Sequence, residues 1–309
     1  MSKLIILDGY SFLFRYFYAM PPYLSGDNVP LNAVRGCANR FIKILKGNPG
    51  ASFCCALDAG GPTFRNKIDP EYKANRVEVP KDLIPQFDAF DDMLQSLGIN
   101  GTRRNGYEAD DIIASYVRKY GNSCDITIFT ADKDLMQLVS ENVKILNLSN
   151  NNIFTVKEVE EKYGIKPSQI SDYLSIVGDS ADNIKGIPGV GPKTAVKLLN
   201  EYPNANAIYS DIDNIKPEGL RLKLQDGKEQ WAISRDLVAL YDNIDKLEEL
   251  EVLKHGGFND ERLDNFLERN RLNRSFFSFG ISGSEGKENQ STNSASNSSS
   301  NANQQLSLF

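Results

Sequence analysis

The sequence contains one histidine, His255, and four cysteines, Cys37, Cys54, Cys55 and Cys124. A single histidine excludes a zinc site built on several imidazoles, and it leaves a Ser-His catalytic triad with almost no support. The cysteines show no Cys-x-x-Cys spacing, which indicates reduced core thiols rather than a metal cluster or a disulfide framework. Chemistry that depends on these two residue types is therefore not expected.

Long apolar runs are also missing. No segment approaches the roughly 20 apolar residues that a membrane span needs, and the apolar stretch at 3–8 is too short for a signal peptide. We therefore expect a cytoplasmic protein without a membrane segment. The net charge is −6, whereas nucleic-acid-binding proteins are usually basic. A negative net charge is compatible with DNA binding if many of the acids belong to a site for divalent cations.

Short apolar runs alternate with helical patterns in the first half of the chain. The predicted strands are 3–8, 52–58, 125–130 and 143–147. The predicted helices are 32–46, 82–97 and 108–120. This alternation predicts an α/β fold with a largely parallel central sheet flanked by helices. Residues 59–81 are rich in Lys, Arg, Asn and Pro and lack a long apolar face, so we expect an extended excursion there.

From about residue 155 the pattern becomes all-helical. Thr155 and Glu158 predict a capping box, and helical spacing recurs near 155–163, 168–177, 192–200, 228–241 and 260–270. From residue 281 the chain is dominated by Ser, Asn and Gln, which is typical of disorder. We expect three regions: an α/β core over 1–154, a helical subdomain over 155–280 and a disordered tail over 281–309.

Acidic residues follow predicted strands or begin predicted helices at five places. Asp8 and Asp58 end two strands, and the other acids lie in the motifs at 106–111, 130–134 and 178–183. The carboxyl ends of parallel strands meet at one edge of a sheet, so these acids can gather there. Mg²⁺ prefers oxygen ligands and acts in pairs ~3.5–4 Å apart in phosphoryl displacement. Any one aspartate could be a cap or a solvated turn, Asp132 in particular, but the set favours a two-metal phosphodiester-cleaving site.

The glycine-rich segment 186–199 predicts a helix–hairpin–helix motif. Gly189 and Gly191 form a turn that leads into a helix with Pro192 at its first position. The free N–H groups of that helix start, together with Lys193 and Lys197, suit binding of a nucleic-acid backbone without sequence preference. The alternative is a tight turn between two core helices.

Together these motifs resemble the 5′-nuclease domain of bacterial DNA polymerase I, within the wider flap endonuclease family. The resemblance covers roughly residues 3–275 and is carried also by Leu7-Asp8-Gly9, Phe64-Arg65 and the Tyr72–Arg76 segment. It implies a PIN-like 5′-nuclease fold and a structure-specific 5′-3′ exonuclease and flap endonuclease acting in primer removal, replication and repair. No polymerase domain follows, so we expect a stand-alone, monomeric nuclease.

The resemblance also implies roles for single residues. The first metal group would be Asp8, Asp58, Glu108, Asp110, Asp132 and Asp134. The second would be Asp179 and Asp182, with Asp111 in support, and the metal would be Mg²⁺, two ions, with Mn²⁺ as a substitute. Lys73 and Arg76 would clamp the scissile phosphate at the base of a helical arch over about 59–100. The DNA contacts would be Arg15, Tyr72, Gly189, Gly191, Lys193 and Lys197, with K⁺ at the hairpin. For Tyr10, stacking on a base and packing remain equally open.

The chain ends in a short apolar peptide. Gln305, Leu306, Leu308 and Phe309 resemble the motif with which bacterial replication proteins bind the sliding clamp. Such a peptide can fill an apolar groove on a partner, and an accidental apolar end is the alternative. Two rival functions also remain open, namely a non-catalytic junction-binding module and a PIN-like ribonuclease that acts on structured RNA.

Overall fold

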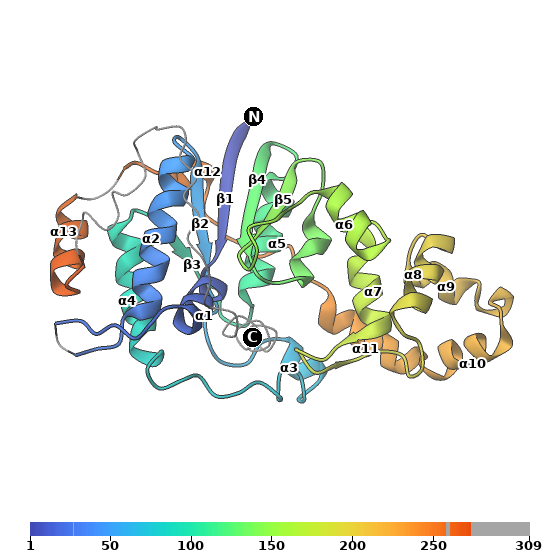
Figure 1. The fold of residues 1–309 in the computed structure, drawn as a ribbon. Helices are drawn as coiled ribbons and strands as arrows, with labels where there is room; N and C mark the ends of the chain where they lie inside the picture. The colour runs from blue at the N-terminus through green and yellow to red at the C-terminus, as the bar shows by residue number, and fades with distance from the viewer. Residues whose placement is uncertain (27, 258–259, 273–309) are drawn as a thin grey trace, which may run out of the picture.

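The computed structural model describes residues 1–26, 28–257 and 260–272, which form an α/β body beside a helical region (Figure 1). The body is built on a six-stranded sheet in the order β3-β2-β1-β4-β5-β6. These strands are β1 (Ser2–Asp8), β2 (Ser52–Ala56), β3 (Asn100–Thr102), β4 (Cys124–Thr130), β5 (Val143–Asn147) and β6 (Ile153–Phe154). The first five are parallel, and only β6 of these six runs antiparallel, against β5. The predicted fold class is confirmed.

Strand β1 lies at the centre of this sheet. Its residues Leu4, Ile5, Ile6 and Leu7 are fully buried because both faces of the sheet are covered by helices, which explains why the strand is continuously apolar. β1 pairs with β2 on one side and β4 on the other, so the chain order reverses at β1. In open α/β sheets the crevice at such a reversal, outside the carboxyl strand ends, is the usual ligand site. Asp8 closes β1 at that edge.

Helices cover both faces of the sheet. On one face α1 (Gly9–Ala19), α2 (Asn32–Gly47) and α4 (Ile84–Ser96) pack over Ile5 and Leu7. On the other face α5 (Ala109–Tyr120) packs over Leu4 and Ile6. Adjacent side chains of a strand point to opposite faces, so alternate residues of β1 pack against the two helical layers.

The helical region continues the core on the α5 side. Its elements are α6 (Val156–Tyr163), α7 (Ile170–Val177), α8 (Pro192–Glu201), α9 (Ala205–Ser210), α10 (Glu218–Asp226) and α11 (Lys228–Val238). A small hairpin of β7 (Gly178–Asp179) and β8 (Ile184–Lys185) follows α7. α11 packs along α7, and the Trp231 indole donates a hydrogen bond to Ser175 at 3.1 Å. Three short 3-10 helices lie at Asp134–Leu138, Pro167–Gln169 and Ile212–Asn214.

The expected helical subdomain over 155–280 does not stay apart from the α/β body. After α11 the chain returns to the sheet edge, where Ser52 bridges to Lys254 beside α12 (Leu250–Leu253). α13 (Asp260–Arg269) then packs on α4, and Phe266 and Leu267 join the core of the α1–α2–α4 face (Figure 1). The apolar residues of α13 are buried in this way, because an amphipathic helix needs a partner to cover its apolar stripe. The predicted tail, 281–309, lies outside the described residues.

The link between β2 and α4 differs from the expected helical arch. It contains one short helix, α3 (Arg65–Ile68), then turns at 70–75 and a segment without regular structure at 76–80. α4 itself packs on α2 and α13 and belongs to the body. The segment over 59–81 thus has the extended character that the sequence predicts, and α4, which the predicted arch over about 59–100 includes, is packed on the body. Within the described ranges, no helix has the length and apolarity needed to cross a membrane.

Candidate active site

A cavity of about 650 Å³ opens at the carboxyl edge of the sheet, beside the central strand β1. Eight of the nine acids that the sequence assigned to metal binding line it, together with both predicted phosphate-clamping cations. These residues are Asp8, Asp58, Glu108, Asp110, Asp132, Asp134, Asp179, Asp182, Lys73 and Arg76. They come from strand ends, the start of α5, the β7–β8 hairpin and the link that precedes α4.

Local hydrogen bonds fix the acids at the strand ends. Asp8 caps α1 through the Ser11 N–H at 3.4 Å and accepts a hydrogen bond from the Thr130 hydroxyl at 2.6 Å. Asp58 accepts from the Ala109 N–H at 2.9 Å, which ties the second strand end to the start of α5. Asp132 accepts a hydrogen bond from the Asp134 N–H at 2.7 Å, which stabilises the turn after β4. Asp132 also lines the cavity.

Four of these carboxylates lie close together with little positive charge among them; we call Asp8, Asp110, Asp132 and Asp134 the acidic cluster. Burial, followed by repulsion from Asp132 and Asp58, raises the pKa of Asp8 to about 7, although Thr130 opposes this. Burial and repulsion by Asp132 likewise raise the pKa values of Asp110 and Asp134. Asp134 Oδ1 is buried without a hydrogen-bond partner, and no described residue pairs with the Asp110 side chain.

A second group of lining residues pairs acids with cations; we call Lys73, Arg76, Glu108 and Asp182 the paired wall. Lys73 Nζ lies 2.9 Å from Glu108 Oε2 and 3.6 Å from Asp182 Oδ2. Arg76 Nη2 lies 2.8 Å from Asp182 Oδ1. Burial alone would raise the pKa of Asp182, but Lys73 and Arg76 lower it below its usual value.

The link segment is held against the β7–β8 hairpin by its own backbone. Lys73 has φ of +59°, a left-handed conformation that is costly for lysine, and its N–H donates to the Asp182 carbonyl at 3.0 Å. Asn75 donates to the Ser180 carbonyl at 2.7 Å, and Asn183 donates to the Glu71 carbonyl at 2.7 Å. The two cations therefore reach the cavity on a turn that the hairpin fixes.

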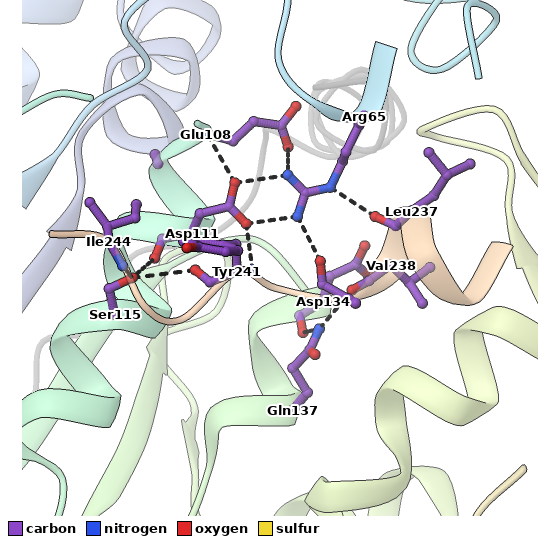
Figure 2. Close-up of polar contacts among 12 residues, drawn as sticks. Arg65, Glu108, Asp111, Ser115, Asp134, Gln137, Leu237, Val238, Tyr241 and Ile244 are labelled. Carbon is purple, nitrogen blue, oxygen red and sulfur yellow. Dashed lines mark hydrogen bonds and ion pairs between the residues drawn. The ribbon is translucent and has the colours of Figure 1, made fainter. Parts of the chain in front are cut away.

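Asp111, the ninth acid, which was predicted to support the metal group, does not line the cavity. It is fully buried, and Arg65 binds both of its carboxylate oxygens at 2.8 Å (Figure 2). The same oxygens also accept from the N–H groups of Glu108 at 3.1 Å and Tyr241 at 2.9 Å. No oxygen of Asp111 is left for a metal ion.

Three other residues discussed from the sequence, Tyr72, Tyr10 and Arg15, lie in and around the site. Tyr72 is 5% exposed and its hydroxyl lies 3.1 Å from Glu108 Oε2, which leaves little of its surface for the predicted contact with DNA. Tyr10 lines the cavity and packs edge-on against Phe87 with ring centroids 4.9 Å apart. Arg15 donates to the carbonyl of Ser149 at 3.2 Å, which places it at the cavity rim.

The predicted hairpin lies in the helical region, and none of its residues lines the cavity. Gly189 has φ of +74°, which favours glycine, and Gly191 precedes the first residue of α8. Lys193 and Lys197 are exposed on α8. Lys223 donates to the Gly189 carbonyl at 3.2 Å, so one hairpin carbonyl already contacts a cation.

Sequence reasoning missed several residues of the site. Lys133 lies within the acidic motif at 130–134 but was not expected to belong to the site, and its Nζ lies 2.9 Å from Asp179 Oδ1. The side chains of Phe14, Val77 and Val79 give the cavity an apolar side that no motif indicated. The role of Arg65 was missed because its partners, at 108–111 and 237–239, are far away in the sequence.

The carboxylates surround the cavity without converging on one point. Within the described ranges, no three His, Cys, Asp or Glu side chains are close enough to hold an ion as they stand. Lys73 and Lys133 lie against three of them, Glu108, Asp182 and Asp179. The donor set nevertheless fits a hard divalent cation, because it is made of oxygens and includes the unpartnered Asp134 Oδ1. Binding would require rotation of side chains into the cavity.

Two family models match the chain in succession. Residues 3–164 match "5′-3′ exonuclease, N-terminal resolvase-like domain", and residues 165–261 match "5′-3′ exonuclease, C-terminal SAM fold". The 5′-3′ exonuclease of Aquifex aeolicus is 38% identical over 246 residues, which are 79% of this chain and 84% of that protein. The DNA polymerase I of Caldicellulosiruptor bescii is 37% identical over 268 residues, which are 84% of this chain but only 31% of the polymerase.

Solved structures share the fold. A T5 5′-exonuclease with bound zinc ions superimposes with a TM-score of 0.64 at 22% identity, covering 87% of this chain and 99% of that one. The catalytic core of Rad2 in complex with a DNA substrate gives a TM-score of 0.58 at 16% identity, covering 87% of each chain. At 22% and 16% identity, the structural similarity shows a shared fold and no more.

Proposed function

This chain belongs to the 5′-3′ exonuclease family, and from that membership we propose that it is a metal-dependent, structure-specific 5′ nuclease. Its substrate would be DNA with a 5′ end or 5′ flap beside duplex, with or without an RNA primer, and it would act as a monomer. One observation carries the proposal: eight carboxylates and three cationic side chains, those of Lys73, Arg76 and Lys133, surround one cavity at the carboxyl edge of the sheet. Such a site suits hydrolysis of a phosphodiester during primer removal, replication and repair.

The donor set supports two Mg²⁺ ions, with Mn²⁺ as a substitute, because both metals prefer carboxylate oxygen and water. Asp8, Asp58, Glu108, Asp110, Asp132 and Asp134 would hold the first ion, and Asp179 and Asp182 the second. Bound there, two ions supply the Lewis-acid chemistry that in-line displacement at phosphorus needs. The raised pKa values in the acidic cluster support this assignment, because they reflect burial of the carboxylates and then repulsion among them, and a bound divalent cation would relieve both.

Lys73 and Arg76 would bind the non-bridging oxygens of the scissile phosphate, since both line the cavity as flexible cations on a fixed turn. They now pair with Glu108 and Asp182. When metal and substrate enter, the acids would turn to the metal and the cations to the phosphate. This exchange of partners keeps every buried charge compensated.

The exposed hairpin would bind the duplex away from the cut. Gly189 and Gly191 allow close approach of a phosphate to the backbone, and Lys193 and Lys197 add charge without reading sequence. A K⁺ ion held by hairpin carbonyls remains part of the proposal. It would have to coexist with Lys223, which already contacts the Gly189 carbonyl.

The test is cleavage of a 5′-labelled flap duplex with and without Mg²⁺. We expect Mg²⁺-dependent release of the flap and its loss in Asp179→Asn. Asp125→Asn is the matched control, because Asp125 lies at the opposite end of β4 and pairs with Lys144 away from the cavity. Metal-independent cutting, or equal cutting by Asp179→Asn, would contradict the proposal. Binding without cutting would favour the junction-binding module, and preference for structured RNA would favour the ribonuclease.

We further propose that Gln305, Leu306, Leu308 and Phe309 bind a bacterial sliding clamp. These residues lie outside the described part of the structure, so the proposal depends on their sequence alone. Deletion of residues 305–309 should abolish capture of the chain by immobilised clamp while free flaps are still cut. Unchanged capture would refute the assignment.

A further inference from the structure

Arg65 is the largest fully buried side chain of the described residues, at 2% exposed. Its guanidinium makes hydrogen bonds to four residues, and these occupy all five of its N–H groups. A charged group that is buried so deeply is tolerated only when it is fully paired. Arg65 does not line the cavity, so any effect on the proposed chemistry must pass through its partners.

Those partners come from two segments that are far apart in the sequence. Nη1 and Nη2 bind the two oxygens of Asp111 at 2.8 Å, and Nη1 also lies 3.4 Å from Glu108 Oε2. Nε and Nη2 donate to the carbonyls of Leu237 and Ala239, each at 2.8 Å, at the end of α11 (Figure 2). Carbonyls at a helix end lack partners within the helix and favour a cation.

Glu108 is the only one of these partners that lines the cavity. Asp111, fixed by Arg65, accepts the Glu108 N–H at 3.1 Å and thereby holds its backbone at the start of α5. Arg65 Nη1, Tyr72 and Lys73 then surround Oε2 of the same side chain. Arg65 therefore helps to locate both the backbone of Glu108, through Asp111, and its carboxylate, which Tyr72 and Lys73 also contact.

We propose that Arg65 is a positioning residue, which aims the Glu108 carboxylate into the metal-binding cavity and ties its position to the end of α11. The inference rests on the proposed function, because it assigns a task to a residue of the same site. Asp111 acts as the intermediate between Arg65 and the Glu108 backbone. Residues of this kind typically change metal affinity or activity by ~10–100-fold when they are replaced.

The test compares Arg65→Lys with the wild type as full-length proteins. Lysine keeps the charge but cannot bind both oxygens of Asp111 while also reaching Leu237 and Ala239. Measured by isothermal titration, Mg²⁺ should bind ~10–100-fold more weakly, and kcat on a flap at saturating Mg²⁺ should fall by a similar factor. KM for the flap should change less than about twofold, because Arg65 contacts no surface that DNA can reach.

Glu248→Gln is the matched control for loss of stability. Glu248 holds the other half of α5, where it accepts hydrogen bonds from Tyr116 and from Thr102 at 3.0 Å. This variant should lower Tm while Mg²⁺ affinity and kcat stay at the wild-type level. If it weakens Mg²⁺ binding as much as Arg65→Lys does, or if Arg65→Lys lowers Tm alone, Arg65 has no positioning role.

A second variant decides the case if Arg65→Lys fails to fold. Arg65→Met combined with Asp111→Leu removes both buried charges at once and should recover a folded protein. Mg²⁺ should still bind ~10–100-fold more weakly than in the wild type, whereas wild-type affinity would overturn the inference. The titration needs no substrate, so the two proposals fail separately: a wild type that binds Mg²⁺ but cuts no flap contradicts the nuclease and leaves the role of Arg65 in place.

Discussion

Asp110 and Asp111 are neighbours in the chain, yet their carboxylates lie in opposite surroundings. Asp111 is fully buried and has four hydrogen bonds, two of them from Arg65. Asp110 faces the cavity, has no partner among the described residues, and has a pKa raised by burial and by repulsion from Asp132 and Asp8. The paired carboxylate serves the fold, and the unpaired one is free to bind a ligand.

The same contrast separates the paired wall from the acidic cluster. On the paired wall, cations within 3.6 Å lower the pKa of Asp182 despite its burial. In the acidic cluster burial raises the pKa values of Asp8, Asp132 and Asp134, and repulsion from neighbouring carboxylates of the site adds to this rise. Leaving charge unpaired destabilises a protein, so the acidic cluster is where stability would be given up for the proposed metal binding.

The largest expected effect comes from exchanging the two neighbours for asparagine. Asp110→Asn should lower flap cleavage on the order of 10²–10³-fold, because it removes a charge from the proposed metal site. Without metal it should raise Tm, because it also removes repulsion from Asp132 and Asp8. Asp111→Asn should lower stability by roughly 3–5 kcal/mol, because Arg65 is left buried without its counter-charge.

Thermal unfolding in metal-free buffer tests the expected rise in Tm for Asp110→Asn and the expected fall for Asp111→Asn. Flap cleavage in Mg²⁺ is measured on the same samples. Asp242→Asn is the control, since Asp242 is an exposed aspartate paired only with the exposed Arg118. A fall in Tm for Asp110→Asn comparable to that of Asp111→Asn would erase the distinction between the two carboxylates.

A smaller effect is expected from Mg²⁺ itself. The ion should raise Tm, because it binds the folded protein alone; at about 100 times its dissociation constant the gain is about 2.7 kcal/mol. Asp110→Asn should lose most of that gain, since the acidic cluster is where the charge would be neutralised. The measurement is Tm against MgCl₂ with NaCl at matched ionic strength. An equal shift with NaCl would mean that general screening, not a site, relieves the repulsion.

Asp110 and Asp111 also show which features of the fold and the site the sequence can predict. Strand-helix alternation predicted the sheet, and strand ends predicted where the acids gather, because both signals are local. Both aspartates sit in the first turn of α5, and spacing alone could not tell that one meets Arg65, 46 residues earlier. The short strands β3 and β6 and the return of α13 to α4 were missed for the same reason: they depend on contacts between distant segments.

The smallest expected effect concerns Asp179, whose surroundings are intermediate between those of the paired Asp111 and the unpaired Asp110. Its carboxylate is buried at 4% exposure, but its cation, Lys133, is half-exposed and its Nζ lies 2.9 Å away. An ion pair with one exposed partner contributes ~0.2–1 kcal/mol, so Lys133→Met should change stability by no more than that. The same change removes a cation that competes with metal, so Mg²⁺ should bind Asp179 and Asp182 about 1.5–5-fold more tightly. Isothermal titration measures this, with Lys157→Met, in an exposed pair on α6, as the control. Weaker Mg²⁺ binding by Lys133→Met would mean that Lys133 orients Asp179 for the metal. Asp179 would then belong with the carboxylates that a cation holds in place, as Arg65 holds Asp111.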